Sequence, residues 1–159
     1  MVKNFSSLLI VTHPWDLANT SLWKGKWDIR GYKNDDEVFE MFVKRTLKKY
    51  ILAKRNEGIP VCIFLGLDEF RIHPALIGTY EFVMYEPVYK MIPLLKELGV
   101  RNIEIVGFCW DICVKSLYND LRNSFNTKVN IRYCLPTVNG SVQYFEALYN
   151  YAKKGVHPW

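Results

Sequence analysis

The chain has 159 residues, of which 50% are hydrophobic and 23% charged, and its formal net charge is +5. This length and composition predict a single globular domain over residues 1–159 with a substantial core, and they exclude a disordered chain. No apolar run is long enough to cross a bilayer and no signal-peptide pattern is visible, so we expect a cytoplasmic protein that does not contact a membrane. The basic residues are scattered and no nucleic-acid-binding motif accompanies them, which does not favour nucleic acid as a partner.

The four cysteines and three histidines do not form a metal-binding pattern. Cys109 and Cys113 are four positions apart, which is not the CxxC spacing of zinc sites, and each histidine is followed by proline. We therefore predict neither a metal nor a cofactor, and we expect the cysteines to be reduced thiols in a reducing compartment.

The first half of the chain alternates between strand and helix patterns. Residues 8–11 form a continuous apolar run, which is typical of a central parallel strand buried on both faces. A long loop with three tryptophans is predicted over residues 15–34, followed by an amphipathic helix from residue 35 or 36 to about 56. Apolar runs at residues 59–65 and 80–85 predict the second and third strands.

The second half continues this alternation. A short helix is predicted over residues 91–98, a buried strand over 103–106 and a helix from residue 111. An edge strand follows at residues 128–133 and a last helix at about 141–154. Strands that alternate with helices predict a three-layer α/β/α sandwich with a mainly parallel sheet of five to six strands.

The segment from Asn102 to Asn123 carries the clearest chemical signal. Its strand is followed by Gly107 and then by a helical pattern, so the intervening turn lies at the carboxyl edge of the sheet, where α/β proteins bind ligands. Cys113 falls in the first turn of this helix. The helix dipole and unpaired backbone N–H groups favour a thiolate there, so Cys113 is a candidate nucleophile.

The motif Gly107-Phe-Cys-Trp-Asp-Ile-Cys-Val114, together with the order of elements, resembles the isochorismatase-like cysteine hydrolases, which include the nicotinamidases. The resemblance gives Cys113 the position of the catalytic cysteine. It implies a hydrolase that acts on an amide or a related C–N or C–O bond of a small molecule. Trp110 stands where the family usually has a small or hydroxyl-bearing residue, and the Cys109–Trp110 peptide corresponds to one that is often cis in the family.

The resemblance also shows where the sequence departs from the family. Thr12 stands at the end of the first strand, where the family has its catalytic Asp, and Asp16 matches a later acid of that segment. Glu86 stands where the catalytic Lys is expected. The substrate-binding positions implied by the resemblance are Trp15, Asp16, Cys109, Trp110 and Asp111.

One hypothesis is a hydrolase with different catalytic partners. Cys113 attacks the carbonyl carbon, the backbone N–H groups of Cys109 and Cys113 hold the oxyanion, and His13 or Glu86 acts as the base. Strand alternation predicts that His13 points away from Cys113. Glu86 opposes thiolate formation unless it takes the proton itself.

The alternative hypothesis is a catalytically inactive family member, because two of the three catalytic positions are substituted. Such a pseudoenzyme would keep the pocket for a small ligand, or a surface for a protein partner, and the aromatic loop from Trp15 to Trp27 is a candidate for either role. Homo-oligomers are common in the family, so we also consider self-association.

Overall fold

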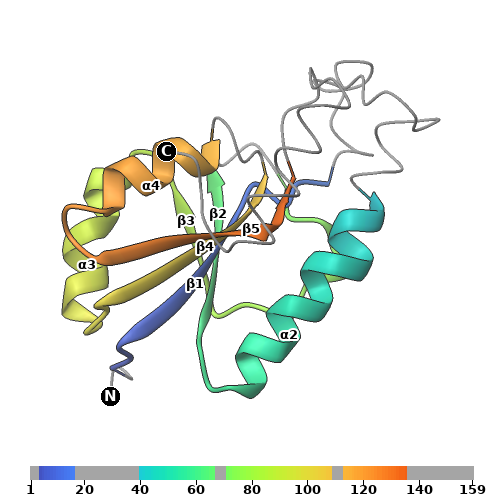
Figure 1. Cartoon of the computed structure of the whole chain (residues 1–159), viewed down its shortest axis with the longest axis horizontal. Helices are drawn as coiled ribbons and strands as arrows, with labels where there is room; N and C mark the ends of the chain where they lie inside the picture. Colours follow the sequence, from blue (N-terminus) through green and yellow to red (C-terminus); the bar gives the residue numbers. More distant parts are fainter. Residues whose placement is uncertain (1–3, 17–39, 67–70, 109–112, 136–159) are drawn as a thin grey trace.

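A computed structural model describes residues 4–16, 40–66, 71–108 and 113–135 of the chain. In this part of the chain, five strands form one parallel sheet in the order β3-β2-β1-β4-β5 (Figure 1). The strands are β1 (Ser7–Thr12), β2 (Val61–Gly66), β3 (Phe82–Tyr85), β4 (Asn102–Phe108) and β5 (Asn126–Leu135).

The predicted central strand is confirmed. β1 pairs with β2 on one side and β4 on the other, and all of its residues from Leu8 to Thr12 are buried. A continuous apolar run is required here because both faces of a central parallel strand are covered. The prediction of an edge strand near residues 128–133 is also confirmed, since β5 pairs only with β4 among the described strands.

Helices cover both faces of the sheet, which confirms the three-layer sandwich (Figure 1). The helix over Phe42–Leu47 (η2) is wound as a π-helix and continues directly into α2 (Lys48–Asn56) on one face. On the other face lie α3 (Met91–Glu97) and α4 (Lys115–Leu121). Short 3-10 turns are formed by Pro74–Leu76 (η3) and Val88–Lys90 (η4). None of the described helices is long and apolar enough to cross a membrane.

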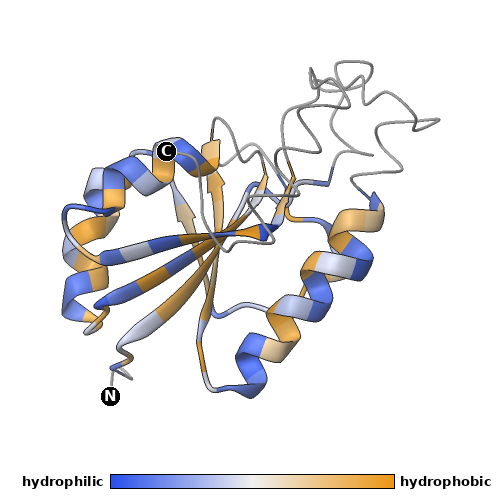
Figure 2. Cartoon of the chain, in the orientation of Figure 1, coloured by the Kyte–Doolittle hydropathy of each residue, from blue (hydrophilic) through white to orange (hydrophobic). Residues whose placement is uncertain are grey.

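The core consists of two apolar clusters, one on each face of the sheet. Leu9 and Val11 of β1 pack with Ile51 of α2, whereas the alternating residues Leu8 and Ile10 pack with Leu117 of α4 and its neighbours. Figure 2 shows that β1 and β2 are apolar over most of their length, whereas each helix carries both apolar and polar residues. This alternation fixes which strand residues lie on which side of the sheet.

Several predicted boundaries differ from the structure: β2 spans Val61–Gly66, β3 spans Phe82–Tyr85 and β5 spans Asn126–Leu135. The strand predicted to end before Gly107 continues through Gly107 to Phe108, because the glycine, with a φ of 111°, packs directly against β1. Cys113 and Val114 are helical and α4 begins at Lys115, whereas residue 111, the predicted start of this helix, lies outside the described residues. The loop predicted at residues 15–34, beyond Asp16, and the last helix predicted at residues 141–154 lie outside the described residues.

Candidate functional site

The candidate site lies where the chain changes direction across the sheet. After β1 the chain builds β2 and β3 on one side, and it then crosses through α3 to build β4 and β5 on the other side. In open α/β sheets, ligands bind at the carboxyl ends of the strands at such a switch point. Here His13 follows β1, and Cys113 comes after β4 at the start of the α4 region.

The backbone of β4 leaves no room for a side chain beside β1 at this point. Thr12 and Gly107 are register partners, and a Cβ atom on Gly107 would lie only 2.3 Å from the carbonyl oxygen of Thr12. Only glycine fits such a backbone contact, and glycine also adopts the positive φ without strain. Gly107 therefore fixes how the end of β4 lies against β1.

His13 has a backbone conformation that is uncommon for residues other than glycine. Its φ is 48°, and its N–H donates a hydrogen bond to the carbonyl of Phe64 at 2.8 Å. Its ring stacks on Trp15 with centroids 4.4 Å apart and on Phe64 with centroids 5.3 Å apart. The imidazole is therefore held between two aromatic rings. It is buried, and neither ring nitrogen has a hydrogen-bond partner within the described part of the chain.

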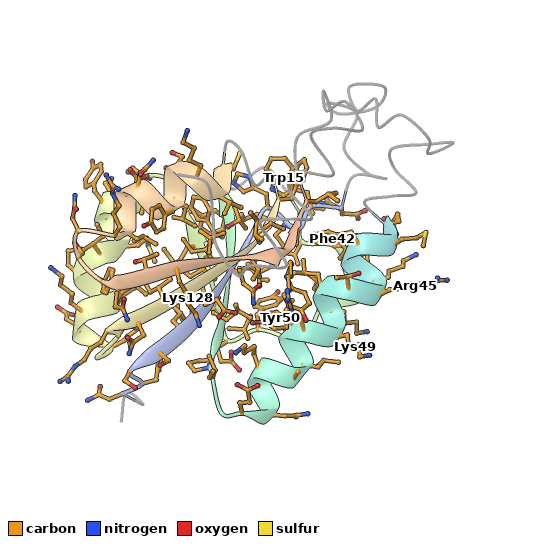
Figure 3. The ribbon with its side chains drawn as sticks, in the orientation of Figure 1. Trp15, Phe42, Arg45, Lys49, Tyr50 and Lys128 are labelled. Atoms are coloured by element: carbon orange, nitrogen blue, oxygen red, sulfur yellow. The ribbon has the colours of Figure 1, made fainter. Side chains whose placement is uncertain are left out.

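The segment after His13 is anchored to the neighbouring strand. The indole Nε1 of Trp15 donates to the carbonyl of Leu65 at 2.9 Å, and the ring contacts Phe108 edge-on. The backbone N–H of Asp16 donates to the carbonyl of Arg71 at 2.9 Å. These contacts hold Trp15 (labelled in Figure 3) in place, and its ring stacks on that of His13.

A pocket of about 160 Å³ opens at this edge of the sheet and brings three predicted catalytic residues together. Its lining residues are His13, Phe64, Glu86, Val88, Cys113, Ser116, Leu117 and Asp120. His13 lines the same pocket as Cys113, contrary to the expectation that it points away from it. Strand alternation stops applying after Thr12, because the positive φ of His13 turns the backbone.

The thiols differ in their surroundings. Cys113 is half-buried and lines the pocket, whereas Cys62 is fully buried in β2 and Cys134 lies within β5. Burial raises the pKa of the Cys62 thiol and the pKa of the Cys134 thiol well above their usual range. Among these three cysteines, Cys113 is therefore the one placed for chemistry with a ligand.

The other predicted site residues have different positions. Thr12 is fully buried in β1, and its Oγ1 has no hydrogen-bond partner among the described residues. Trp15 and Asp16 are buried and are not among the described lining residues of the pocket. Glu86 is exposed at the pocket, with its backbone N–H donating to the carbonyl of Gly66 at 2.7 Å. The predicted residues Cys109, Trp110 and Asp111 lie outside the described residues.

Sequence reasoning missed the contribution of α4 to the pocket. Ser116, Leu117 and Asp120 follow Cys113 at helical spacing and share one face with it. This helical spacing from Cys113 could have indicated from the sequence that these three residues line the pocket. Among the described residues, no group of three or more His, Cys, Asp and Glu side chains could hold a metal ion.

A separate polar network lies between α2 and the sheet, near β5. The hydroxyl of Tyr50 donates to Glu104, and Asn130 Nδ2 donates to the Tyr50 hydroxyl at 3.0 Å. Lys128 Nζ lies 3.0 Å from Glu104 Oε2, and the ring of Tyr50 stacks on Tyr133 with centroids 3.7 Å apart. Figure 3 shows Tyr50 directed toward the sheet, on the side of Lys128. No signal in the sequence connected these residues.

Known proteins resemble this chain in three-dimensional structure, whereas comparisons of sequence find no match. No protein-family model matches the sequence, and neither does any curated protein. An isochorismatase-like hydrolase from Alkaliphilus metalliredigens superposes with a TM-score of 0.61 at 13% identity, covering 96% of this chain and 92% of that one. The chain has the isochorismatase-like fold.

Two further solved structures show the same fold. A nicotinamidase from Bacillus subtilis has a TM-score of 0.59 at 14% identity, with 94% of this chain and 95% of that chain covered. An N-carbamoylsarcosine amidase from Thermoplasma acidophilum also has a TM-score of 0.59 at 14% identity, with 94% and 92% covered. The structural similarity therefore covers nearly the whole chain and is not confined to the motif around Cys113.

Proposed function

We propose that this protein is a cysteine hydrolase that acts through Cys113 on an amide, or a related C–N or C–O bond, of a small molecule. The observation that carries the proposal is the shared pocket of Cys113, His13 and Glu86 at the carboxyl edge of the sheet. The hydrolase names of the structural neighbours are consistent with this chemistry.

In the proposed reaction with an amide, His13 takes the proton from the Cys113 thiol, and the thiolate attacks the carbonyl carbon to form a C–S bond. His13 then gives the proton to the leaving nitrogen as the C–N bond breaks, which releases ammonia and leaves a thioester. Water, deprotonated by His13, attacks the thioester and forms the acid. The Cys113 thiolate leaves and takes the proton back.

His13 is the proposed base because the position of the family's catalytic Asp holds Thr12. A threonine hydroxyl does not take up a proton near neutral pH, whereas histidine ordinarily titrates in that range. His13 is held by Trp15 and Phe64, and within the described residues its ring nitrogens are not engaged by other hydrogen-bonding groups. These features support a role in proton transfer.

The nucleophile is tested by alkylation and by activity. Iodoacetamide near neutral pH should modify Cys113 before Cys62 and Cys134, because burial raises the pKa values of the latter two. Cys113→Ala should abolish ammonia release from small amides, whereas Cys134→Ala serves as a matched control and should retain it. Equal labelling of all four cysteines, or full activity of Cys113→Ala, would contradict the proposal.

The second candidate function is ligand binding without turnover. The specific observation in its favour is the substitution of both partners of the cysteine, since Thr12 is a buried neutral residue and Glu86 carries the charge opposite to that of lysine. Losing members of a catalytic unit typically lowers rates by several powers of ten. A thermal-shift screen with small amides, combined with product detection, separates the candidates, because binding without product supports this second function.

A single domain over residues 1–159, a cytoplasmic location and self-association stay predictions. Size-exclusion chromatography with light scattering measures the last of these directly.

A further inference from the structure

The candidate pocket has an apolar base and an acidic mouth. Phe64, Val88 and Leu117 are buried residues of its lining, whereas Glu86 and Asp120 are exposed. The two carboxylates come from different elements, because Glu86 follows β3 and Asp120 belongs to α4. No lysine or arginine is present among the described lining residues, so the mouth carries negative charge although the chain as a whole carries +5.

These two carboxylates differ from most other acidic side chains of the described chain. Neither Glu86 nor Asp120 has a side-chain hydrogen bond or ion pair in the part of the chain that the structure describes. By contrast, four other glutamates each form an ion pair with a lysine or arginine: Glu40–Lys44, Glu57–Lys54, Glu81–Arg55 and Glu104–Lys128. The negative charge at the mouth is therefore not neutralised by these cations.

An independent observation marks the pocket as a ligand site. His13 lines the same pocket and is only 7% exposed, yet neither of its ring nitrogens has a hydrogen-bond partner within the described residues. A buried polar group is normally hydrogen-bonded, so a polar ligand in this pocket would supply a missing partner. His13 and the half-buried Cys113 therefore give the pocket two polar groups in addition to the two carboxylates.

We propose that the pocket selects small amides that carry a positively charged ammonium group close to the amide. This inference rests on the proposed hydrolase function and adds the substrate class. Glu86 and Asp120 attract the ammonium group, while the amide lies toward Cys113 and His13. A volume of about 160 Å³ corresponds to about five water molecules at about 30 Å³ each, so the substrate is small.

The test uses three amides of similar size and different charge at neutral pH. β-Alaninamide is cationic, butanamide is neutral and malonamate is anionic. We expect kcat/KM for β-alaninamide to exceed that for butanamide by about three- to tenfold, because exposed carboxylates attract a cation only weakly. Malonamate should be the poorest substrate, because its own carboxylate is repelled. The preference should shrink as the salt concentration rises, because salt screens exposed charges.

Substitutions locate the effect. Asp120→Asn and Glu86→Gln should each lower the ratio of the rates for β-alaninamide and butanamide by about threefold. Glu97→Gln is the matched control, because Glu97 is an exposed residue at the end of α3 that does not line the pocket. It should leave the ratio unchanged. The inference is overturned if Asp120→Asn does not change this ratio. It is also overturned if malonamate is hydrolysed faster than β-alaninamide.

A binding measurement separates this inference from the proposed function. The same three amides are tested for their ability to protect Cys113 from iodoacetamide. If no amide is hydrolysed but β-alaninamide protects Cys113 best, the hydrolase proposal fails and the charge selectivity stands. If amides are hydrolysed but protection and turnover do not depend on their charge, the hydrolase proposal stands and the selectivity fails.

Discussion

The imidazole of His13 stacks on the indole of Trp15, with ring centroids 4.4 Å apart and ring planes inclined by 17°. Phe64 covers the imidazole through a second stacked contact at 5.3 Å. This arrangement holds a histidine at a φ of 48°, in the left-handed region that few residues other than glycine adopt. The packing of Trp15 therefore determines the position of the proposed base.

Substitution of Trp15 should separate its hydrogen bond from its packing. Trp15→Phe keeps an aromatic ring for His13 and removes the bond to the Leu65 carbonyl, so we expect the free energy of unfolding to fall by about 1–2 kcal/mol. Trp15→Ala also removes the buried ring and should lower the free energy of unfolding by about 3–5 kcal/mol. Urea unfolding measures both values, and equal losses in the two variants would contradict the assigned packing.

His13→Asn should remove activity while keeping the fold. Asparagine tolerates a positive φ, so the turn after β1 should form without added strain. The proposed base is lost, and we expect kcat/KM for amide hydrolysis to fall by about 10²- to 10⁴-fold. Urea unfolding of the same variant provides the control for stability. Activity within threefold of the unsubstituted protein would exclude His13 as the base.

The sheet and the position of Cys113 could be predicted because they depend on local patterns. The apolar run at residues 8–11 indicates a strand buried on both faces, and β1 is indeed the centre of the sheet. The change from strand to helix pattern around Gly107 placed Cys113 at the beginning of a helix, where the structure has it. Both features are determined by residues close together in the sequence.

The remainder of the site depends on contacts that a single sequence does not encode locally. The direction of His13 is set by one backbone angle and by two rings, and only one of these, Trp15, is a sequence neighbour. Asp120 could have been found, because it lies seven residues after Cys113 on the same helical face. Glu104 could not have been paired with Tyr50, since 54 positions separate them and only the packing of α2 on the sheet brings them together.

Gly107→Ala should be far more destabilising than Gly78→Ala, although both glycines have a positive φ. A Cβ on Gly107 would lie 2.3 Å from the Thr12 oxygen, whereas a Cβ on Gly78, with a φ of 80°, would meet no atom within 4 Å. We expect Gly78→Ala to cost about 1–2 kcal/mol from backbone strain alone. Gly107→Ala should add about 1–3 kcal/mol or more from the clash between β1 and β4. Similar urea midpoints for the two variants would contradict the close contact.

Tyr50 should make the stability of the fold depend on pH in the alkaline range. Its phenol is partly buried between α2 and the sheet, where it donates to Glu104 and accepts from Asn130. Burial, followed by the neighbouring Glu104 carboxylate, raises the pKa of Tyr50 far above its usual value near 10. The folded protein therefore keeps the phenol proton at a pH where the unfolded chain begins to release it.

The direction of the pH effect follows from linkage. A raised folded-state pKa stabilises the fold fully below pH 10, and this contribution is lost as the pH rises from about 10 toward the folded-state value. Tyr50→Phe removes the titrating group, and below pH 10 it should be less stable because Glu104 loses its donor.

Urea unfolding of both proteins between pH 8 and 11 provides the measurement. The stability difference between the unsubstituted protein and Tyr50→Phe should be constant up to about pH 9.5 and should then narrow, because only the unsubstituted protein loses the Tyr50 contribution. Cys62 and Cys134 also have raised pKa values, but they are present in both proteins and cancel in the comparison. A difference that widens above pH 10 would mean that the Tyr50 phenolate is favoured in the folded state, contrary to its burial beside Glu104.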